Sequence, residues 1–288
     1  MILVTAATGE FGNFVVRKLL KRVPPEKVAV AVRNPAKAHH FAAQGITVRR
    51  ADYDDLQSWF PAVVDVDRLL LISSPEFDVE KRVAQHLRVI DAAVALRVRQ
   101  IAYTSFIGAD TPRPGGFNAH YLTERVLERC GIAYTFLRNP FYTESVLPKE
   151  FLEESVRKGV VKSAAGTHPV NTATRANLAE AAAVVLATDG HERTACDLTG
   201  PPWTFPQLAA SLARFTGLPI ELRDVPLEEL GPMAFVVELI AEGYFERNTP
   251  HLEQLIGRRP IDLDQYVKNV LGPMKDSLVR EFARAATE

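Results

Sequence analysis

The sequence has few of the features that mark secreted, membrane or nucleic-acid-binding proteins. Its two cysteines, Cys130 and Cys196, are too few and too far apart for a disulfide framework or a zinc site. No apolar run reaches about 18 residues, the length needed to span a bilayer, and the first residues do not follow a signal-peptide pattern. The formal net charge of −1 gives no electrostatic reason to expect nucleic acid or a membrane as a partner. We therefore expect a cytoplasmic protein.

The rest of the composition is typical of a globular chain with a full core. Of 288 residues, 47% are hydrophobic and 24% are charged, which suits one large domain or a domain with a smaller appendage. No internal repeat or low-complexity tract is present. His39 and His40 are adjacent but have no further ligands at metal spacing, so no metal site is predicted.

Apolar segments alternate with amphipathic ones through the first half of the chain. A helix at residues 79–95, for example, is predicted from Val83, Leu87, Ile90 and Val94, which share one helical face. Near-continuous apolar strands separated by helices are typical of a parallel sheet that is covered on both faces. Strands are predicted at residues 2–4, 28–32, 46–49, 68–72, 100–105 and 133–138, and further helices at residues 35–44, 55–62 and 120–130.

The first predicted strand ends in a turn of small residues, Thr5-Ala6-Ala7-Thr8-Gly9-Glu10-Phe11-Gly12, which opens a helix. The turn follows the spacing G-x-x-G-x-x-G, with Ala6 in place of the first glycine. Glycine allows a tight turn and a close approach of the backbone to phosphate, while the helix N-terminus attracts a pyrophosphate. We therefore predict a dinucleotide site here, the alternative being a plain turn between strand and helix. Ala6 suits that site if its φ is negative.

The end of the second predicted strand indicates which dinucleotide binds. A site for NAD places an acid there for the ribose 2′-hydroxyl, whereas arginine suits the 2′-phosphate of NADP. This chain has Arg33, with Lys37 close behind and no acid in reach. A guanidinium on a phosphate makes a charge-assisted hydrogen bond, so we predict NADP(H) as the cofactor. The alternative is a surface arginine before a helix that Asn34 caps and Pro35 begins.

Strand, glycine turn, helix and strand are the opening of a Rossmann unit. The predicted fold class is therefore α/β, with a Rossmann-type doubly wound parallel sheet and a small C-terminal lobe. Residues 1–145 are expected to form the NADP(H)-binding domain. Because the alternation breaks down beyond about residue 145, residues 146–288 are expected to complete the sheet and to form a smaller, substrate-facing lobe.

Nine short segments, met in order along the chain, resemble one known family. They are the turn of residues 5–12, Val32-Arg33-Asn34-Pro35, Ala51-Asp52-Tyr53, Leu71-Ile72-Ser73-Ser74, Ile101-Ala102-Tyr103-Thr104-Ser105, Thr135-Phe136-Leu137-Arg138-Asn139, Phe141-Tyr142-Thr143-Glu144, Ala164-Ala165-Gly166 and Ala173-Thr174-Arg175-Ala176. Together they resemble the NmrA-like branch of the atypical short-chain dehydrogenases/reductases, and within it the bacterial NAD(P)H:quinone oxidoreductases. The resemblance covers nearly the whole chain and loosens after about residue 225.

The resemblance implies a Rossmann domain, a small C-terminal lobe, and a cleft between them for the nicotinamide and a substrate. It implies that residues 5–12 hold the pyrophosphate and that Arg33 holds the 2′-phosphate. It also implies further cofactor contacts from Ser73, Ser74, Pro75, Leu137, Asn139, Pro140, Phe141 and Tyr142, and substrate contacts from Phe141, Tyr142, Asn171 and Arg175. The resemblance leaves open whether the chain forms a homodimer.

The chain departs from the wider superfamily in the helix after the fifth predicted strand. Carbonyl-reducing members use a Tyr-x-x-x-Lys pair, in which the lysine lowers the tyrosine pKa so that it donates a proton to the alkoxide. Aligned on the family pattern, this chain has Gly116 at the tyrosine position and His120 at the lysine position. Tyr121 and Arg125 have the same spacing but lie five residues late. Ordinary alcohol–ketone chemistry is therefore not expected.

Reduction of a quinone does not require a strong proton donor in the site, because hydride addition gives a phenolate-type anion that is far more stable than an alkoxide. Positioning a flat substrate then matters more than acid catalysis. We predict NADPH-dependent quinone reduction by direct hydride transfer, with His120 as proton donor at physiological pH. One alternative is a non-catalytic NADP(H)-binding redox sensor or regulator of the NmrA-like type, which the missing pair also suits. Another is an enzyme like the nucleotide-sugar epimerases, which the missing pair disfavours.

Overall fold

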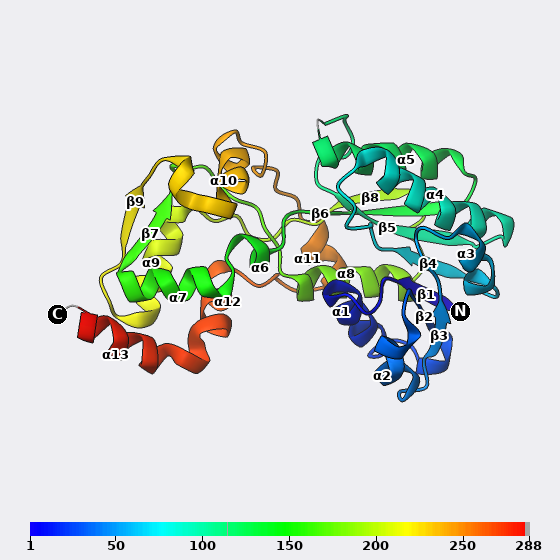
Figure 1. Cartoon of the computed structure of the whole chain (residues 1–288), viewed down its shortest axis with the longest axis horizontal. Helices are drawn as coiled ribbons and strands as arrows, with labels where there is room; N and C mark the ends of the chain where they lie inside the picture. The colour runs from blue at the N-terminus through cyan, green and yellow to red at the C-terminus, as the bar shows by residue number, and fades with distance from the viewer. Residues whose placement is uncertain (114, 286–288) are drawn as a thin grey trace. The chain divides into compact units, whose positions relative to one another are not determined.

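The structure, a computed structural model, describes residues 1–113 and 115–285 (Figure 1). The chain divides into two compact units. The first contains Met1–Asn139, Arg175–Leu198 and Gln254–Gly257; the second contains Pro140–Thr174, Thr199–Glu253 and the residues from Arg258 onward. The first boundary thus lies at Asn139 rather than near residue 145, and the segment Arg175–Leu198 returns to the first unit.

The first unit contains a seven-stranded parallel sheet in the order β3-β2-β1-β4-β5-β6-β8. The chain runs outward from β1 in one direction and then from β4 in the other, so the strand order reverses between these two central strands. This is the order of a doubly wound Rossmann sheet and confirms the predicted fold. The strands are β1 (Ile2–Thr5), β2 (Val28–Val32), β3 (Thr47–Arg50), β4 (Arg68–Leu71), β5 (Gln100–Phe106), β6 (Ala133–Asn139) and β8 (Thr194–Asp197).

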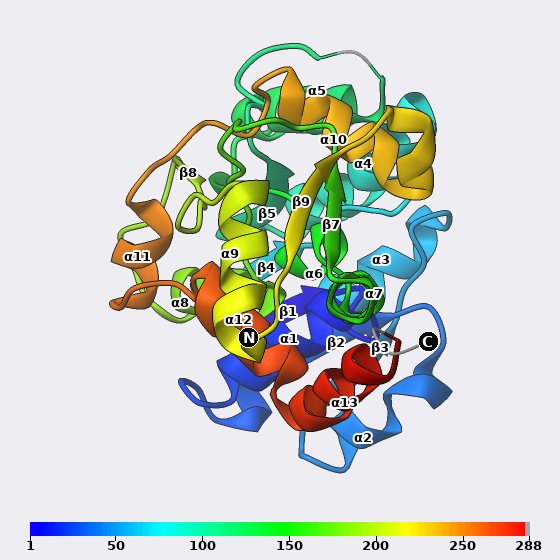
Figure 2. The ribbon, with the colours of Figure 1, turned by 90° about the vertical axis from the view of Figure 1, so that its left-hand side faces the viewer.

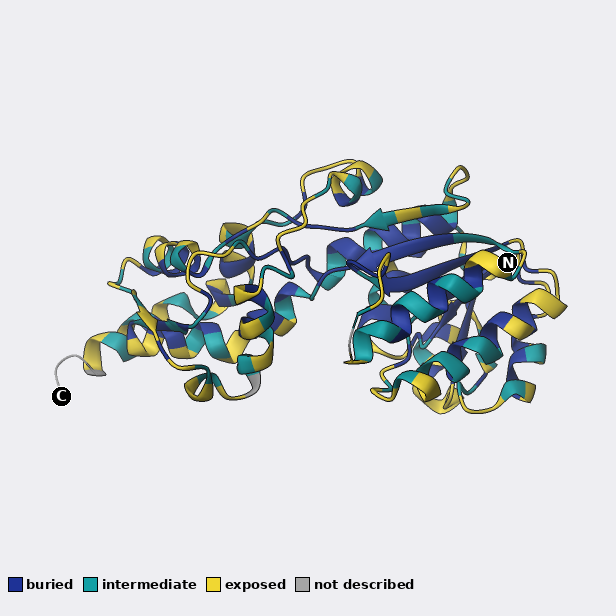
Figure 3. Cartoon of the chain, turned by 90° about the horizontal axis from the view of Figure 1, so that it is seen from above, coloured by how far each residue is buried: buried dark blue, intermediate teal, exposed yellow. Residues whose placement is uncertain are grey.

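Helices cover both faces of this sheet (Figure 1). On one face α3 (Leu56–Val63), α4 (Val79–Ala95) and α5 (Asn118–Arg129) pack side by side. On the other, α1 (Glu10–Leu19) packs against α8 (Arg175–Ala187), where the Lys18 ammonium lies 2.7 Å from the Glu180 carboxylate. Strands β1, β2 and β4 are buried along their whole length, and apart from Thr5 and Arg68 their residues are all apolar, as expected for strands that are covered on both faces. Figure 3 shows dark blue, buried strands inside this unit.

The predicted elements match the structure closely where the apolar pattern is strong and differ where local hydrogen bonds intervene. The strand at residues 28–32 and the helix at residues 79–95 have the predicted bounds. The helix predicted at residues 35–44 is instead a 3₁₀ turn, η2 (Pro35–Ala38), followed by one helical turn, α2 (His39–Ala42). The Asn34 side chain accepts a hydrogen bond from the Ala36 N–H at 3.0 Å and fixes that turn. The first unit also contains the 3₁₀ turns η1 (Pro25–Lys27) and η3 (Gly115–Phe117).

The second unit is built around a two-stranded parallel sheet of β7 (Val160–Ser163) and β9 (Glu221–Asp224), which Figure 2 shows side by side. Helix α9 (Phe205–Thr216) begins with a capping box of Thr204 and Gln207 and ends at Gly217, whose φ is +76°. The other elements are α6 (Thr143–Val146), α7 (Lys149–Lys158), η4 (Leu227–Met233), α10 (Ala234–Ala241), α12 (Leu263–Leu271), η5 (Gly272–Met274) and α13 (Lys275–Ala285). Helix α11 (His251–Ile256) contains the boundary between Glu253 of the second unit and Gln254 of the first.

The helices give no sign of a transmembrane segment: in residues 1–113 and 115–285, none combines the length and the apolar character needed to cross a bilayer.

Candidate cofactor site

The turn after β1 presents the N-terminus of α1 at the carboxyl edge of the sheet. Gly9 is the N-cap residue, with φ −72° and ψ 162°, and no side chain caps the helix there. A Cβ on Gly12 would lie 2.6 Å from the Ala6 carbonyl oxygen, and one on Gly9 would lie 3.2 Å from the same oxygen. The turn is therefore packed as tightly as the glycine spacing predicts, and it leaves the first N–H groups of the helix for an anionic ligand.

Ala6 does not meet the condition expected for it, since its φ is +49°. The left-handed region costs an L-residue roughly 1–2 kcal/mol, because Cβ approaches the following carbonyl oxygen. The turn keeps the backbone shape of a glycine although the residue is alanine. This strain is local, and the tight packing around Gly12 holds it in place.

Replacing Ala6 with glycine should relieve this strain. We expect Ala6→Gly to raise the free energy of unfolding by about 0.5–1 kcal/mol, the strain released less the extra backbone entropy of glycine. Chemical denaturation of the variant and the parent measures the difference. The control is Ala7→Gly, which removes a buried methyl group, relieves no positive φ and should lower stability. A loss of stability in Ala6→Gly would contradict this account of the turn.

A pocket of about 620 Å³ opens at the carboxyl ends of β1, β2, β3 and β4, where the strand order reverses. Ligands of open α/β sheets bind at such a switch point, and the volume is that of a ligand site. The predicted residues that line it are Ala6, Thr8, Gly9, Arg33, Ser74 and Pro75. Thr5, Ala7, Phe11 and Gly12 are buried behind this wall, whereas Glu10 is exposed.

Arg33 and Lys37 give one side of the pocket a positive charge. Both are exposed lining residues, and neither has a carboxylate within ion-pair distance in the part of the chain that the structure describes. Two cations without a protein counter-ion suit a phosphate group, which Arg33 can hold through two parallel N–H donors. The residues present therefore fit a dinucleotide with a 2′-phosphate.

Sequence reasoning assigned no role to the opposite wall, formed by Tyr53, Asp54, Lys81 and Gln85. The Tyr53 hydroxyl donates to the Ile72 carbonyl at 2.5 Å and lies 2.8 Å from the Thr5 hydroxyl, and burial raises its pKa above the ordinary value. Gln85 donates to the Asp54 carboxylate at 2.9 Å. A role for Tyr53 was predictable from the sequence, because Ala51-Asp52-Tyr53 follows the third predicted strand as it does in the family that the chain resembles.

Arg82 was also missed, and it connects Ser73 to His120. Its guanidinium donates to the Ser73 hydroxyl through Nε at 3.1 Å and through a terminal nitrogen at 2.8 Å. The same terminal nitrogen lies 3.2 Å from His120 Nε2, and His120 Nδ1 lies 3.0 Å from the Tyr103 hydroxyl. Because an arginine only donates, Nε2 is the acceptor and the proton of the neutral ring is assigned to Nδ1.

The surroundings of His120 do not fit the role predicted for it. The side chain is 6% exposed, and burial, with Arg82 and His86 nearby, holds its pKa well below the ordinary value. A ring that is neutral at physiological pH, with both nitrogens hydrogen-bonded inside the protein, is not an imidazolium donor. The contact between Arg82 and His120 could not be predicted from the sequence, because the two residues are 38 positions apart along the chain.

His86 supplies a test of this buried network. Its Nε2 accepts the Ser74 N–H at 2.9 Å, Nδ1 lies 2.9 Å from the Thr123 hydroxyl, and burial, followed by the charge of Arg82, lowers its pKa to about 3. An unfolded chain takes up this proton near pH 6.5, whereas the folded chain does not. The stability that His86 contributes is therefore present above pH 6.5 and declines as the pH falls towards 3, by about 1.5 kcal/mol between pH 6.5 and 5.

His120 should change stability in the same direction. Urea denaturation at pH 5, 6 and 7 measures the dependence, and His86→Gln should reduce its slope. The control is His39→Gln, which changes an exposed histidine and should leave the slope unaltered. An unchanged slope in His86→Gln would mean that burial does not lower the pKa of His86 in the folded chain.

The remaining predicted residues are divided between the units. In the first, Leu137 is 1% exposed within β6. Asn139, at the carboxyl end of that strand, has a buried Oδ1 atom for which residues 1–113 and 115–285 supply no hydrogen-bond partner. Arg175, expected in the lobe, instead begins α8 of the first unit, where its Nε lies 3.4 Å from the Glu10 carboxylate. Helix α8 packs against α1, which brings the pair together.

In the second unit, Pro140 is buried and the Phe141 ring lies 5.0 Å from that of Phe245. Tyr142 is the N-cap residue of α6. Asn171 is fully buried, and neither its amide nitrogen nor its amide oxygen has a hydrogen-bond partner among the described residues. Unpaired buried amides are rare in folded proteins, so Asn139 and Asn171 each remain candidates for a ligand contact.

Comparison with known proteins agrees with this site. A family model described as NAD(P)H-binding matches residues 6–189. Quinone oxidoreductase 2 of Escherichia coli (strain K12) is 44% identical over 244 residues, which are 84% of this chain and 82% of that protein.

Two solved structures share the fold over 94% of this chain and 100% of their own. One is the triphenylmethane reductase of Citrobacter sp. complexed with NADP(H), with a TM-score of 0.89 and 35% identity. The other is an NADPH-dependent quinone oxidoreductase of Escherichia coli complexed with NADPH, with a TM-score of 0.84 and 38% identity. The chain thus belongs to the NAD(P)H-binding family, as an NmrA-like member of the atypical short-chain dehydrogenases/reductases.

Proposed function

We propose that the chain reduces quinones with NADPH. The observation that carries the proposal is the pocket at the switch point, with Arg33 and Lys37 on its wall, in a chain 44% identical to a quinone oxidoreductase. When bound, the cofactor supplies a hydride from its nicotinamide to the substrate. The protein supplies the binding, the orientation and the electrostatic surroundings.

Each wall of the pocket has its own part in binding. The turn at Gly9 offers the open N–H groups of α1 to the pyrophosphate, and Arg33 with Lys37 holds the 2′-phosphate. Tyr53 and Gln85 fix the opposite wall through their hydrogen bonds. The positive charge of Arg33 and Lys37 favours NADPH over NADH, because only NADPH carries the 2′-phosphate.

The surroundings of His120 favour a quinone over a ketone as substrate. The positions that align with the Tyr-x-x-x-Lys pair hold Gly116 and His120, so neither the tyrosine that protonates an alkoxide nor the lysine that assists it is present there. His120, in the lysine position, is neutral and buried. Reduction of a quinone leaves a stabilised phenolate-type anion, for which water is a sufficient proton source. The charge of Arg82 beside Ser73, at the carboxyl end of β4, adds a favourable field for an anion.

The nicotinamide and substrate contacts of the family remain a proposal for this chain. We assign Asn139 to the carboxamide of the nicotinamide, because its buried Oδ1 has no partner and can accept a hydrogen bond. Pro140, Phe141 and Tyr142 follow it directly in sequence and keep their proposed cofactor roles. Asn171 keeps its proposed substrate role, for which its unpaired amide is suited.

The proposal is tested by the choice of electron acceptor. The purified protein should oxidise NADPH with 1,4-benzoquinone well above the uncatalysed rate, and it should not do so with aliphatic ketones or sugars. Oxidation is followed by the loss of nicotinamide absorbance. Tight NADPH binding without oxidation across a panel of quinones would favour the non-catalytic sensor instead.

The role of His120 is tested by His120→Ala. Because the ring is neutral and acts through Arg82, we expect the quinone-reduction rate to fall by less than the ~10²–10⁴-fold that accompanies loss of an essential acid. The parent should show no change in kcat with a midpoint near pH 6.5. The control, His168→Ala, removes an exposed histidine of the second unit. A loss within that range, together with a midpoint near pH 6.5, would restore His120 as the proton donor.

We also propose that the chain works in the cytoplasm. Cys130 and Cys196 are both free, as is usual in that reducing compartment.

A further inference from the structure

The second unit contains a pocket that shares no residue with the cofactor site. It has a volume of about 370 Å³ and lies among α6, α7, β7, α9, β9, η4 and α10. That volume is within the range of small-molecule sites. We propose that this pocket binds a flat aromatic molecule with one anionic group, a carboxylate or a sulfonate.

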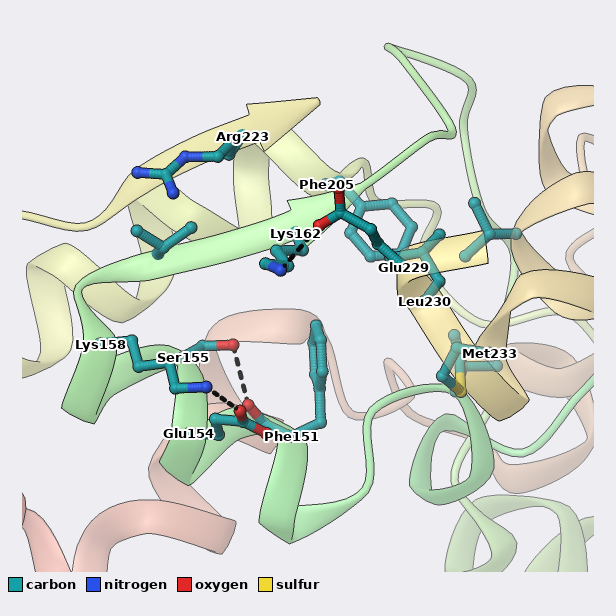
Figure 4. A pocket seen from close by; sticks show the side chains of 13 residues that line it. Phe151, Glu154, Ser155, Lys158, Lys162, Phe205, Arg223, Glu229, Leu230 and Met233 are labelled. Carbon is teal, nitrogen blue, oxygen red and sulfur yellow. Dashed lines mark hydrogen bonds and ion pairs between the residues drawn. The ribbon is translucent and has the colours of Figure 1, made fainter. Parts of the chain in front are cut away.

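The walls of the pocket are mainly apolar. Phe151 projects from α7 and Phe205 from the start of α9, and Figure 4 shows both rings and Met233 around the same hollow. The remaining apolar lining residues are Val146, Val160, Leu230 and Val237. Aromatic rings gain from stacking against other rings, and a methionine adapts to the shape of what it contacts. A one- or two-ring aromatic group is therefore the best match to these walls.

The charged groups around the hollow favour an anion. Lysine and arginine contribute Lys158, Lys162 and Arg223, whereas the lining carboxylates are Glu154 and Glu229. Glu221, which does not line the pocket, lies 3.3 Å from the Arg223 guanidinium, so each of the three cations has a carboxylate partner and an anionic ligand must exchange with one of them. Lys162, from β7, lies over the hollow beside Phe205 in Figure 4 and is half-buried, so its charge reaches a ligand that the aromatic walls hold.

The existing ion pairs do not prevent Lys162 from taking a new partner. Its ammonium lies 2.9 Å from the Glu229 carboxylate, and that side chain is 50% exposed. Lys158 and Glu154, 2.5 Å apart, are more exposed still. Solvent-exposed pairs contribute little to stability, so Glu229 can return to water while Lys162 pairs with the ligand. The lysine stem stays along the pocket wall and only the ammonium changes partner.

The experiment uses 1-naphthalenesulfonate as the anionic probe and 1-naphthol as the neutral one, in isothermal titration calorimetry of the full chain. The sulfonate should bind more tightly than the naphthol, with the same affinity when NADPH is saturating. Lys162→Met should weaken sulfonate binding about tenfold and leave naphthol binding unchanged. The matched control is Lys149→Met, which removes a half-exposed lysine at the start of α7, outside the pocket.

A second variant fills the pocket without removing a charge. Met233→Trp should abolish binding of both probes, while its NADPH affinity and circular dichroism stay those of the parent. Three results would overturn the proposal: no binding of the sulfonate, displacement of the sulfonate by NADPH, or equal sulfonate affinity in Lys162→Met and the parent. None of these results depends on whether quinones are reduced.

Discussion

Gly9→Val should weaken NADPH binding by at least about a hundredfold, more than 2.5 kcal/mol, in a domain that stays folded. A Cβ at this position already lies 3.2 Å from the Ala6 carbonyl oxygen, and valine adds two methyl groups where the pyrophosphate must approach the helix N-terminus. Gly9 is exposed, so the valine side chain would occupy the space of the cofactor and would not disturb the protein core. Fluorescence titration with NADPH measures the loss.

Two comparisons isolate the cause. Gly9→Ala should weaken NADPH binding less than Gly9→Val, because alanine adds only the Cβ, which lies 3.2 Å from the Ala6 carbonyl oxygen. Gly272→Val, in the second unit, places a Cβ where nothing lies within 4 Å and should leave NADPH binding unaltered. Parent-like affinity in a folded Gly9→Val variant would place the cofactor elsewhere.

Arg33→Ala should weaken NADPH binding by about 1.5–3 kcal/mol, the range of a charged hydrogen bond, which is roughly 10–150-fold. NADH affinity should barely change, because NADH has no 2′-phosphate for the guanidinium to hold. Parallel titrations with both cofactors give the ratio. The control is Arg22→Ala, an exposed arginine outside the pocket.

Equal losses for NADPH and NADH would show that Arg33 stacks on the adenine or supports the fold. In that case the 2′-phosphate would rest on Lys37, the other cation on the same wall. Lys37→Ala then distinguishes a shared phosphate site from a site that the arginine does not serve.

The sheet was predictable because parallel strands buried on both faces are mostly apolar, although this sheet also buries Arg68, Gln100 and Thr135. The apolar run Val28–Val32 predicted the bounds of β2 directly. The length of the amphipathic pattern over residues 79–95 predicted the bounds of α4. The face of α4 was misjudged, however. Val94 is exposed, while Gln85 and His86 are buried, because this helix packs its polar residues into the network behind Ser73.

The cofactor turn was predictable because its pattern is local: the glycines and the start of α1 lie within the eight residues 5–12. The positive φ of Ala6 was not, since a residue type alone does not fix its backbone conformation. The contacts of His120 with Arg82 and Tyr103 were also beyond the sequence. They depend on how α4 and α5 pack together, and burial rather than residue type then sets the charge of the ring.

The most direct test of the central claim is a single-turnover measurement with NADPH deuterated at C4 of the nicotinamide. A quinone reduced by direct hydride transfer in a fixed site should be reduced more slowly with one of the two C4 diastereomers and at the normal rate with the other. The same protein should show no absorbance of a bound flavin. Equal rates with both diastereomers and with unlabelled NADPH, or no turnover at all, would contradict the account.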